Sequence, residues 1–341
     1  MRRNIIIISI LSILLFLFFI FDLLFGSVKV SYSEIVDILI NHNAQASHYS
    51  TIIDFRLPKA MVAIVAGAAL AVSGLQMQTI FRNPLAGPYI LGISSGAGLG
   101  VALLIIGFPG IVTMSYAVMF SQWTIAFAAW IGAAAVLTVI MLVSIRIRDI
   151  MTILIFGMMF GSATSALISI MQYFGADSSV KSFVVWTMGN LGGVTYSQLQ
   201  VMFPVVAAGL LLVFLLPKSL NVLLLGENYA RTMGLNVFRT RLLVFLSTSL
   251  LAGTVTAFCG PIGFIGIAVP HIARLLFRTA NHFILIPGSF LLGINVMLVS
   301  DIISQLPGSG EILPINSITA LIGIPIVIWI IFRNQKISSM V

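Results

Sequence analysis

The chain has 341 residues, of which 60% are hydrophobic and 8% are charged, and its formal net charge is +8. A soluble globular protein carries roughly 25% charged residues, and no soluble fold of this length could bury so much apolar surface. The composition therefore excludes a soluble protein and predicts an all-α, polytopic membrane protein surrounded by lipid. The basic residues lie between apolar segments and form no stripe, so we expect no nucleic-acid partner.

Apolar runs of about 20 residues, the length that crosses a bilayer, recur along the chain. The first run follows Arg2 and Arg3, but it is longer than a signal-peptide core and no small-residue cleavage site follows, so we interpret it as a membrane helix. The eighth is short and contains Pro270 and His271, where we expect a helix break. Residues 109–121 are expected either as a short surface helix or as part of the fourth span. The ten expected spans are 5–25, 60–80, 89–108, 122–143, 150–173, 196–217, 241–259, 261–277, 283–304 and 313–332.

The distribution of basic residues predicts the orientation of these spans. Ten spans place both termini on one side, and basic residues collect on the cytoplasmic side of membrane proteins. The other side receives only Lys29, Arg56, Lys59 and Lys181, so we expect cytoplasmic termini. The cytoplasmic set is Arg2, Arg3, Arg82, Arg146, Arg148, Lys218, Arg231, Arg239, Arg241, Arg274, Arg278, Arg333 and Lys336.

The longest connections leave no room for a soluble domain, so residues 1–341 are expected to form a single membrane domain. Residues 27–55 and 175–195 are mixed polar and predicted to be extracytoplasmic, whereas residues 218–240 are basic and predicted to be cytoplasmic.

A weak internal repeat relates the two halves of the chain. Ala66-Gly67-x-x-x-Ala71-x-x-Gly74 returns as Ala252-Gly253-x-x-x-Ala257-x-x-Gly260. The second expected span runs inward and the seventh outward, so the halves would be inverted repeats of five helices, a common transporter construction. The alternative is that Ala and Gly simply mark tight helix packing.

The region after the second span contains a long ordered motif. It reads Asn83-Pro84-Leu85-Ala86-Gly87-Pro88 and then Leu91-Gly92-Ile93-Ser94-Ser95-Gly96-Ala97. Proline ends a helix and glycine permits close backbone approach, so on physical grounds this is a helix end, a tight turn and a helix with a small-residue face. Further motifs are Arg56-Leu57-Pro58-Lys59, Trp186-Thr187-Met188-Gly189, Gly260-Pro261-Ile262-Gly263-Phe264-Ile265-Gly266 and Pro270-His271-Ile272-Ala273-Arg274.

Together these motifs resemble the vitamin B12/iron-siderophore ABC transporter permease family (FecCD/BtuC type) over nearly the whole chain. The resemblance implies a permease subunit in the bacterial inner membrane that hydrolyses nothing itself. It also implies a second permease subunit, identical or paralogous, an ABC ATPase dimer and an extracytoplasmic substrate-binding protein. The commonest family cargo is an iron-siderophore complex, followed by haem and vitamin B12 or another corrinoid. The family's structural motif maps to Asn83, Pro84, Gly87, Pro88, Gly92, Gly96, Gly263, Gly266, Pro270, His271 and Arg274.

Two contact regions follow from the resemblance. Outside, Arg56 and Lys59 correspond to basic residues that receive acidic side chains of the binding protein; the alternative is basic side chains that reach the membrane interface. The second of them is Arg in the family pattern, and a further basic position is Gln305 here, so docking could be weaker or differently arranged.

Inside, residues 225–234 resemble the loop that couples the permease to the ATPase. Two short helices broken by glycine would form a rigid knob, and Glu227 could pair with Arg231 four residues later. The alternative is an ordinary solvated loop. The residues assigned to coupling are Leu225, Gly226, Glu227, Ala230, Arg231, Met233 and Gly234.

The remaining polar residues do not indicate a catalytic or metal-binding site. Asp301 and Glu311 lie near the outer interface and are interpreted as hydrogen-bonding groups at a helix end and in a loop, with a proton relay as the alternative. The sequence shows no nucleophile-base or metal-ligand spacing, so we expect no catalytic residue, metal or cofactor. The alternative functions are an ion-coupled secondary transporter and, less well supported, an intramembrane enzyme.

Overall fold

The protein is helical throughout the part that the structure, a computed structural model, describes. That part comprises residues 2–26, 28, 30–41, 47–107, 121–147, 149–305 and 312–338. The α-helices are α1 (Arg2–Leu24), α2 (Tyr32–Asn41), α3 (Leu57–Ile80), α4 (Ile93–Ala102), α6 (Gln122–Arg146), α7 (Ile150–Phe174), α8 (Asp177–Thr187), α9 (Tyr196–Phe214), α10 (Pro217–Leu223), α11 (Glu227–Thr232), α12 (Val237–Thr248), α13 (Thr254–Cys259), α14 (Ile265–Phe277), α15 (His282–Ser304) and α16 (Ile315–Ser338). Short π or 3-10 helical turns are η1 (Thr51–Arg56), η2 (Pro88–Leu91), η3 (Leu103–Gly107) and η4 (Ser249–Gly253).

Seven helical segments are long and apolar enough to cross a membrane, and each coincides with an expected span. They are Arg2–Leu24, Thr51–Ile80, Gln122–Arg146, Ile150–Phe174, Tyr196–Phe214, Val237–Cys259 and His282–Ser304. The other three expected spans correspond to shorter apolar helices, Ile93–Gly107, Ile265–Phe277 and Ile315–Trp329. The structure therefore confirms an all-helical, multi-pass membrane protein, whereas the count of ten crossings stays a prediction. The expected surface helix at 109–121 lies almost wholly outside the described residues.

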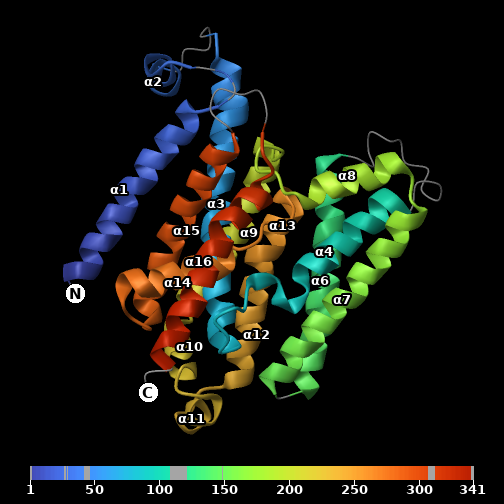
Figure 1. Ribbon diagram of the computed structural model, residues 1–341, viewed down its shortest axis with the longest axis vertical. Coiled ribbons are helices and arrows are strands. Elements are labelled where there is room, and N and C mark those ends of the chain that lie inside the picture. The colour runs from blue at the N-terminus through green and yellow to red at the C-terminus, as the bar shows by residue number, and fades with distance from the viewer. Residues whose placement is uncertain are drawn as a thin grey trace.

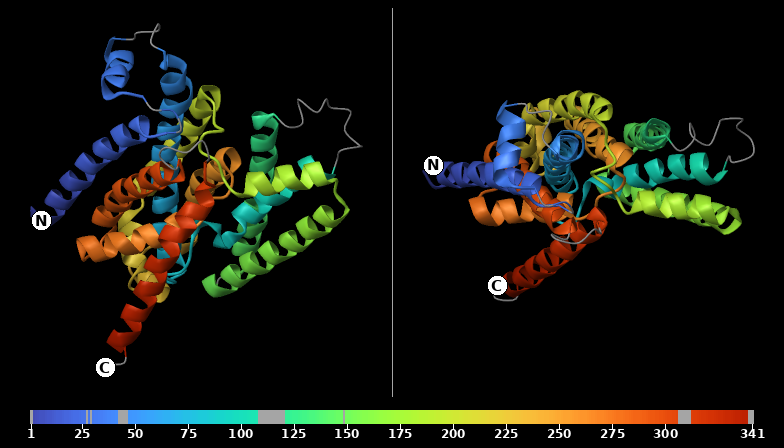
Figure 2. Two further views of the ribbon diagram at one scale, coloured as in Figure 1. Left: turned by 45° about the horizontal axis from the view of Figure 1, so that its top comes forward. Right: turned by 90° about the horizontal axis from the view of Figure 1, so that it is seen from above.

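Helix α3 is the centre of the molecule, with α1 and the α6–α7 pair on opposite flanks (Figures 1 and 2). Of the seven candidate spans it is the most completely buried by other helices. Its close neighbours include α15 and α14, which it meets at glycines. A Cβ at Gly67 would lie 2.4 Å from the carbonyl oxygen of Gly293, and a Cβ at Gly74 would lie 1.8 Å from that of Gly266. These backbones can approach so closely only because no side chain stands between them.

Pro270 lies inside α14 and does not break it, so the expected helix break is wrong. Residues 265–269 are already helical before the proline. Proline lacks the N–H that would bond the carbonyl of Gly266, and that carbonyl instead faces Gly74 of α3. Tertiary packing against α3 therefore keeps the helix continuous.

The two outer connections contain structure that the sequence analysis did not assign. Helix α2 and all but the last residue of the π-helical turn η1 lie within residues 27–55, and α8 lies within residues 175–195. Figure 1 shows α2 and α8 toward one end of the molecule and α10 and α11 toward the other. The described parts of these connections therefore contain short helices at the ends of the membrane helices.

We predict that Gly74→Ala destabilises the protein, because the new Cβ would overlap the backbone oxygen of Gly266. Overpacking of this kind costs about 1–3 kcal/mol. The melting temperature of the purified protein in detergent should fall by several degrees. Gly98→Ala is the matched control, since its Cβ would meet only the Ile168 side chain, at 3.6 Å. An equal melting temperature for the two variants would contradict the packing argument.

Candidate functional site

The motif segments from the two halves of the chain lie against each other at the inner end of α3. Arg274 Nη1 donates to Gln78 Oε1 at 2.5 Å, and Gln78 Nε2 donates to the carbonyl of Ile267 at 3.1 Å. His271 Nε2 donates to the carbonyl of Pro84 at 2.7 Å. Polar side chains of α14 thus hold the turn that follows α3, and His271 and Arg274 have partners that keep them in place.

The remaining motif residues shape the turns around this contact. Asn83 Oδ1 accepts a hydrogen bond from the Leu85 N–H at 2.9 Å, and Asn316 Oδ1 accepts one from Gly263 at 2.9 Å. Gly92 has a φ of 75°, which side-chain-bearing residues rarely adopt. Gly87 lies against Ile267, Pro88 against Gly266 and Gly96 against α6. Each lies in a turn or a helix contact, the kind of position that the sequence analysis assigned to them.

Arg56, predicted to face the binding protein, is buried beside the C-terminal end of α1. Its Nη1 donates to the carbonyls of Leu23 at 2.7 Å and Leu24 at 3.0 Å, and its Nη2 donates to the carbonyl of Val28. The guanidinium therefore closes the end of α1 and holds the chain that leaves it. In this conformation its donors are directed inward, and a docking role stays a prediction.

Lys59 belongs to a buried cluster that joins three helices. Its Nζ lies 2.9 Å from Asp301 Oδ1, with 14% of the lysine side chain and 1% of the aspartate side chain exposed. Gln305 Nε2 donates to Asp301 Oδ2 at 3.2 Å and to Asp22 Oδ1 at 3.0 Å. We call Asp22, Lys59, Asp301 and Gln305 the outer cluster. It links α1, α3 and α15 where they meet the outer surface.

The outer cluster confirms the interpretation of Asp301 as a hydrogen-bonding group at a helix end. Asp22 was missed, although a lone carboxylate at the end of a long apolar run was a usable signal. Gln305 was seen only as the loss of a basic residue, whereas it bridges two carboxylates. Glu311 lies outside the described residues.

Two cavities open on either side of Lys59. One, of about 270 Å³, is lined by residues that include Phe55, Arg56 and Gln305. The other, of about 240 Å³, is lined by residues that include Met188, Asp301 and Pro314. The Lys59 side chain therefore borders both cavities, while its ammonium group is paired with Asp301.

At the opposite end, α10 and α11 form the two short helices that the sequence predicted, with Gly226 between them at a φ of 114°. Ala230 packs inward, whereas Leu225, Tyr229 and Met233 are exposed. Glu227 Oε2 lies 3.8 Å from Arg231 Nη2, which confirms the expected pairing, but Glu227 Oε1 also bonds Arg241 of α12. The closer partner was missed because it lies 14 residues away.

Helix α7 contributes to the largest cavity that we describe, of about 540 Å³. Its walls come from η2, the start of α4 and the middle of α7, and include Tyr89, Ser95, Met158, Ser162 and Ser165. The hydroxyls of Ser162 and Ser165 are satisfied by carbonyls one turn earlier, at 3.1 and 3.0 Å. The residues that line this cavity are uncharged, and most of them are glycine or serine. Within the described residues no group of three or more His, Cys, Asp or Glu side chains could hold a metal ion.

Comparisons with known proteins match this architecture. A model of the FecCD transport family matches residues 13–333. The vitamin B12 import system permease protein BtuC of Klebsiella pneumoniae subsp. pneumoniae is 35% identical over 280 residues, 82% of each chain. The hemin transport system permease protein HmuU of Yersinia pestis is 34% identical over 288 residues, 84% of this chain. A solved inward-facing structure, assigned to a metal-chelate type ABC transporter, superimposes with a TM-score of 0.81 at 28% identity, covering 96% of this chain and 99% of that one.

We predict that Lys59→Met and Asp301→Leu each destabilise the protein by about 3–5 kcal/mol, because each leaves a buried charge without its partner. The double variant should regain most of that loss, since an apolar pair of similar volume replaces a buried ion pair at little cost. Thermal unfolding in detergent of the two single variants, the double variant and the parent forms the cycle. Additive losses in the double variant would show that the two side chains do not stabilise each other.

Proposed function

The chain belongs to the FecCD transport family, and we propose that it is the permease subunit of a bacterial ABC importer for an intact metal chelate. The family match over residues 13–333 carries the proposal. The neutral, hydroxyl-lined wall of α7 supports it, because a surface without metal ligands suits a complex that keeps its metal enclosed. We assign the cargo to the iron-siderophore class, with haem and corrinoids as the alternatives that the experiment below separates.

We further propose ten membrane crossings in two inverted halves of five, with both termini in the cytoplasm. The seven long apolar segments and three shorter ones supply ten elements. The excess of basic residues on one side supports the orientation.

The proposed partners fit the two ends of the molecule. The exposed apolar side chains of Leu225, Tyr229 and Met233 form a knob suited to a groove on an ABC ATPase dimer. At the other end, Lys59 offers a cation between two cavities to an acidic side chain of a substrate-binding protein, with Arg56 shaping the site. A second permease subunit, identical or paralogous, would complete the pathway beside α7.

An ion-coupled secondary transporter is the alternative function. Such a protein uses membrane carboxylates as carriers of its coupling ion, and Asp22 and Asp301 are buried carboxylates. Both are held at the outer end by Gln305 and Lys59. They do not line the α7 cavity, so the geometry favours a role in holding helices together.

Uptake into proteoliposomes decides between these functions. We expect cargo to accumulate only when the permease is reconstituted with its ATPase, its binding protein and ATP. Iron-siderophore, haem and corrinoid are tested in separate experiments. In each, the substrate-binding protein is added either loaded with that compound or empty. Uptake driven by a proton or sodium gradient without ATP would overturn the importer, and uptake of haem or corrinoid alone would overturn the siderophore assignment.

The Lys59→Met/Asp301→Leu double variant also tests docking, because it removes the Lys59 cation together with the carboxylate that pairs with it. We predict that it binds the substrate-binding protein about tenfold more weakly, a change of about 1.4 kcal/mol, and with less dependence on salt. Surface plasmon resonance on the permease in nanodiscs measures both. Lys181→Met, an exposed lysine on α8, is the control. Unchanged affinity in the double variant would remove Lys59 from the interface.

A further inference from the structure

Arg241 connects the exposed coupling helix to the membrane helices. It lies near the start of α12, and only 3% of its side chain is exposed. Its guanidinium bonds the carboxylate of Glu227, at the start of α11. Arg231 approaches the same carboxylate only to 3.8 Å, and 49% of its side chain is exposed. Exposed pairs contribute little, so Glu227 is held mainly by Arg241.

The preceding helix, α10, is attached through the Arg82 guanidinium and the Asn221 side-chain amide. Arg82 Nη2, at the end of α3, donates to the carbonyl of Leu223 at 3.0 Å. Asn221 Nδ2 donates to Asn281 Oδ1 at 2.8 Å, and Asn221 Oδ1 accepts from the His282 N–H at 2.8 Å. These bonds join α10 to α3 and α15. Helix α11 is joined to α12 by the Glu227–Arg241 ion pair.

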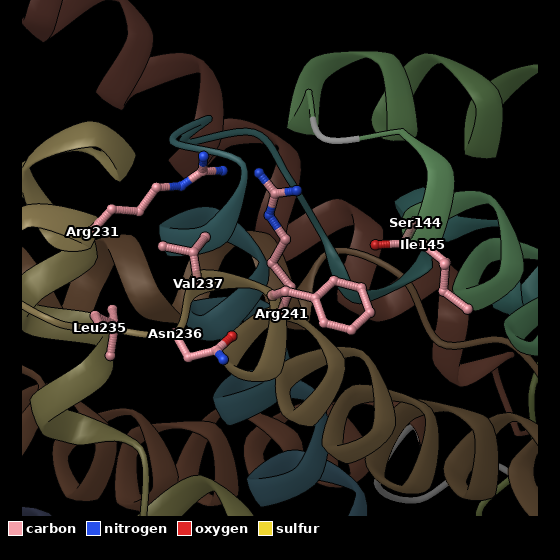
Figure 3. Close-up of a pocket in the computed structure, with 8 residues that line it drawn as sticks. Ser144, Ile145, Arg231, Leu235, Asn236, Val237 and Arg241 are labelled. Carbon is pink, nitrogen blue, oxygen red and sulfur yellow. The ribbon is translucent and has the colours of Figure 1, made fainter.

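Arg241 also faces the end of α6 and the start of α7. It lines a cavity of about 450 Å³ together with Ser144 and Ile145 of α6 and with Arg231. Figure 3 shows the Arg241 side chain between Arg231 on one side and Ser144 and Ile145 on the other. The cavity leaves room for the α6–α7 end to move relative to α12.

Asp149 is the N-cap residue of α7, and the charge of Arg241 affects the pKa of its carboxyl group. Its pKa lies below the ordinary value, mainly because the Thr152 hydroxyl and backbone N–H donate to its carboxylate, with a smaller contribution from the charge of Arg241. Charged groups around Arg241 therefore come from two places: Glu227 and Arg231 on α11, and Asp149 before α7.

We propose that Arg241 is the positioning residue that transmits movement of α11 to α12 and to the α6–α7 end. This rests on the proposed function, in which an ATPase moves the knob formed by Leu225, Tyr229 and Met233. Separating this partly buried ion pair is costly, because Arg241, with only 3% of its side chain exposed, would lose its bonded carboxylate. The pair therefore stays closed when α11 is displaced, and α12 moves with it. Helix α7, which borders the 540 Å³ cavity, lies next along this path.

Loss of the Glu227–Arg241 ion pair should uncouple ATP hydrolysis from transport without dissociating the ATPase from the permease. The apolar knob is untouched by a change at Arg241, so the ATPase should still bind and hydrolyse ATP. The displacement of α11 would no longer be passed on, so less cargo would cross for each ATP hydrolysed. A residue needed only for folding would instead lower assembly, hydrolysis and uptake together.

The test measures ATP hydrolysed per cargo molecule imported, in proteoliposomes that contain the complete complex. We expect Arg241→Gln to raise this ratio at least tenfold while ATP hydrolysis stays within threefold of the parent. Arg239→Gln, an exposed arginine on the same helix, should leave the ratio within twofold. The reversed pair, Glu227→Arg with Arg241→Glu, should recover at least half of the lost coupling.

The outcomes separate this inference from the proposed function. If the parent complex imports cargo with ATP and Arg241→Gln keeps the parental ratio, the inference is overturned and the importer stands. If the parent complex shows no ATP-dependent uptake, the importer itself is wrong. If Arg241→Gln fails to assemble, the reversed pair decides: assembly with a parental ratio supports the inference, and assembly with an uncoupled ratio overturns it.

Discussion

The close approach of α3 to α15 and α14 is the constraint on which the rest of the structure depends. Gly67 against Gly293, and Gly74 against Gly266, bring backbones together at distances that any side chain would prevent. In lipid, helices gain little from burying apolar surface, and packing of this kind provides much of the attraction. Because α3 is fixed along its length, Lys59 at its outer end and Gln78 and Arg82 at its inner end have defined places. The outer cluster and α10 are therefore both attached to α3.

Charged side chains join helices at both ends of α3. The outer cluster connects α1, α3 and α15, while Glu227 and Arg241 connect α11 and α12. A buried ion pair contributes little net stability, but breaking one is expensive. Such pairs are therefore better suited to keeping helices in register than to holding the fold together. The residues that line the α7 cavity are uncharged.

The membrane helices were predictable because each depends on local composition, and the expected ranges agree with the structure to within a few residues at most ends. The pairings were not, because Gln305 lies 283 residues from Asp22 and the repeat gave no register for α15 against α1. The helix break expected at Pro270 failed for a related reason. Local preference argued for a break, but the packing of Gly266 against Gly74, invisible in a single sequence, keeps α14 continuous.

Arg56 and Lys59 show how one motif can hold two different kinds of site. A guanidinium presents several donors in a fixed plane, and Arg56 uses them on the carbonyls of Leu23, Leu24 and Val28. An ammonium is a compact point charge, and Lys59 needs only the Asp301 carboxylate beneath it. An arginine at position 59 would have to place its larger planar group in the same narrow space beside Asp301. Lysine at this position therefore fits the space beside the Asp301 carboxylate, which Gln305 also contacts.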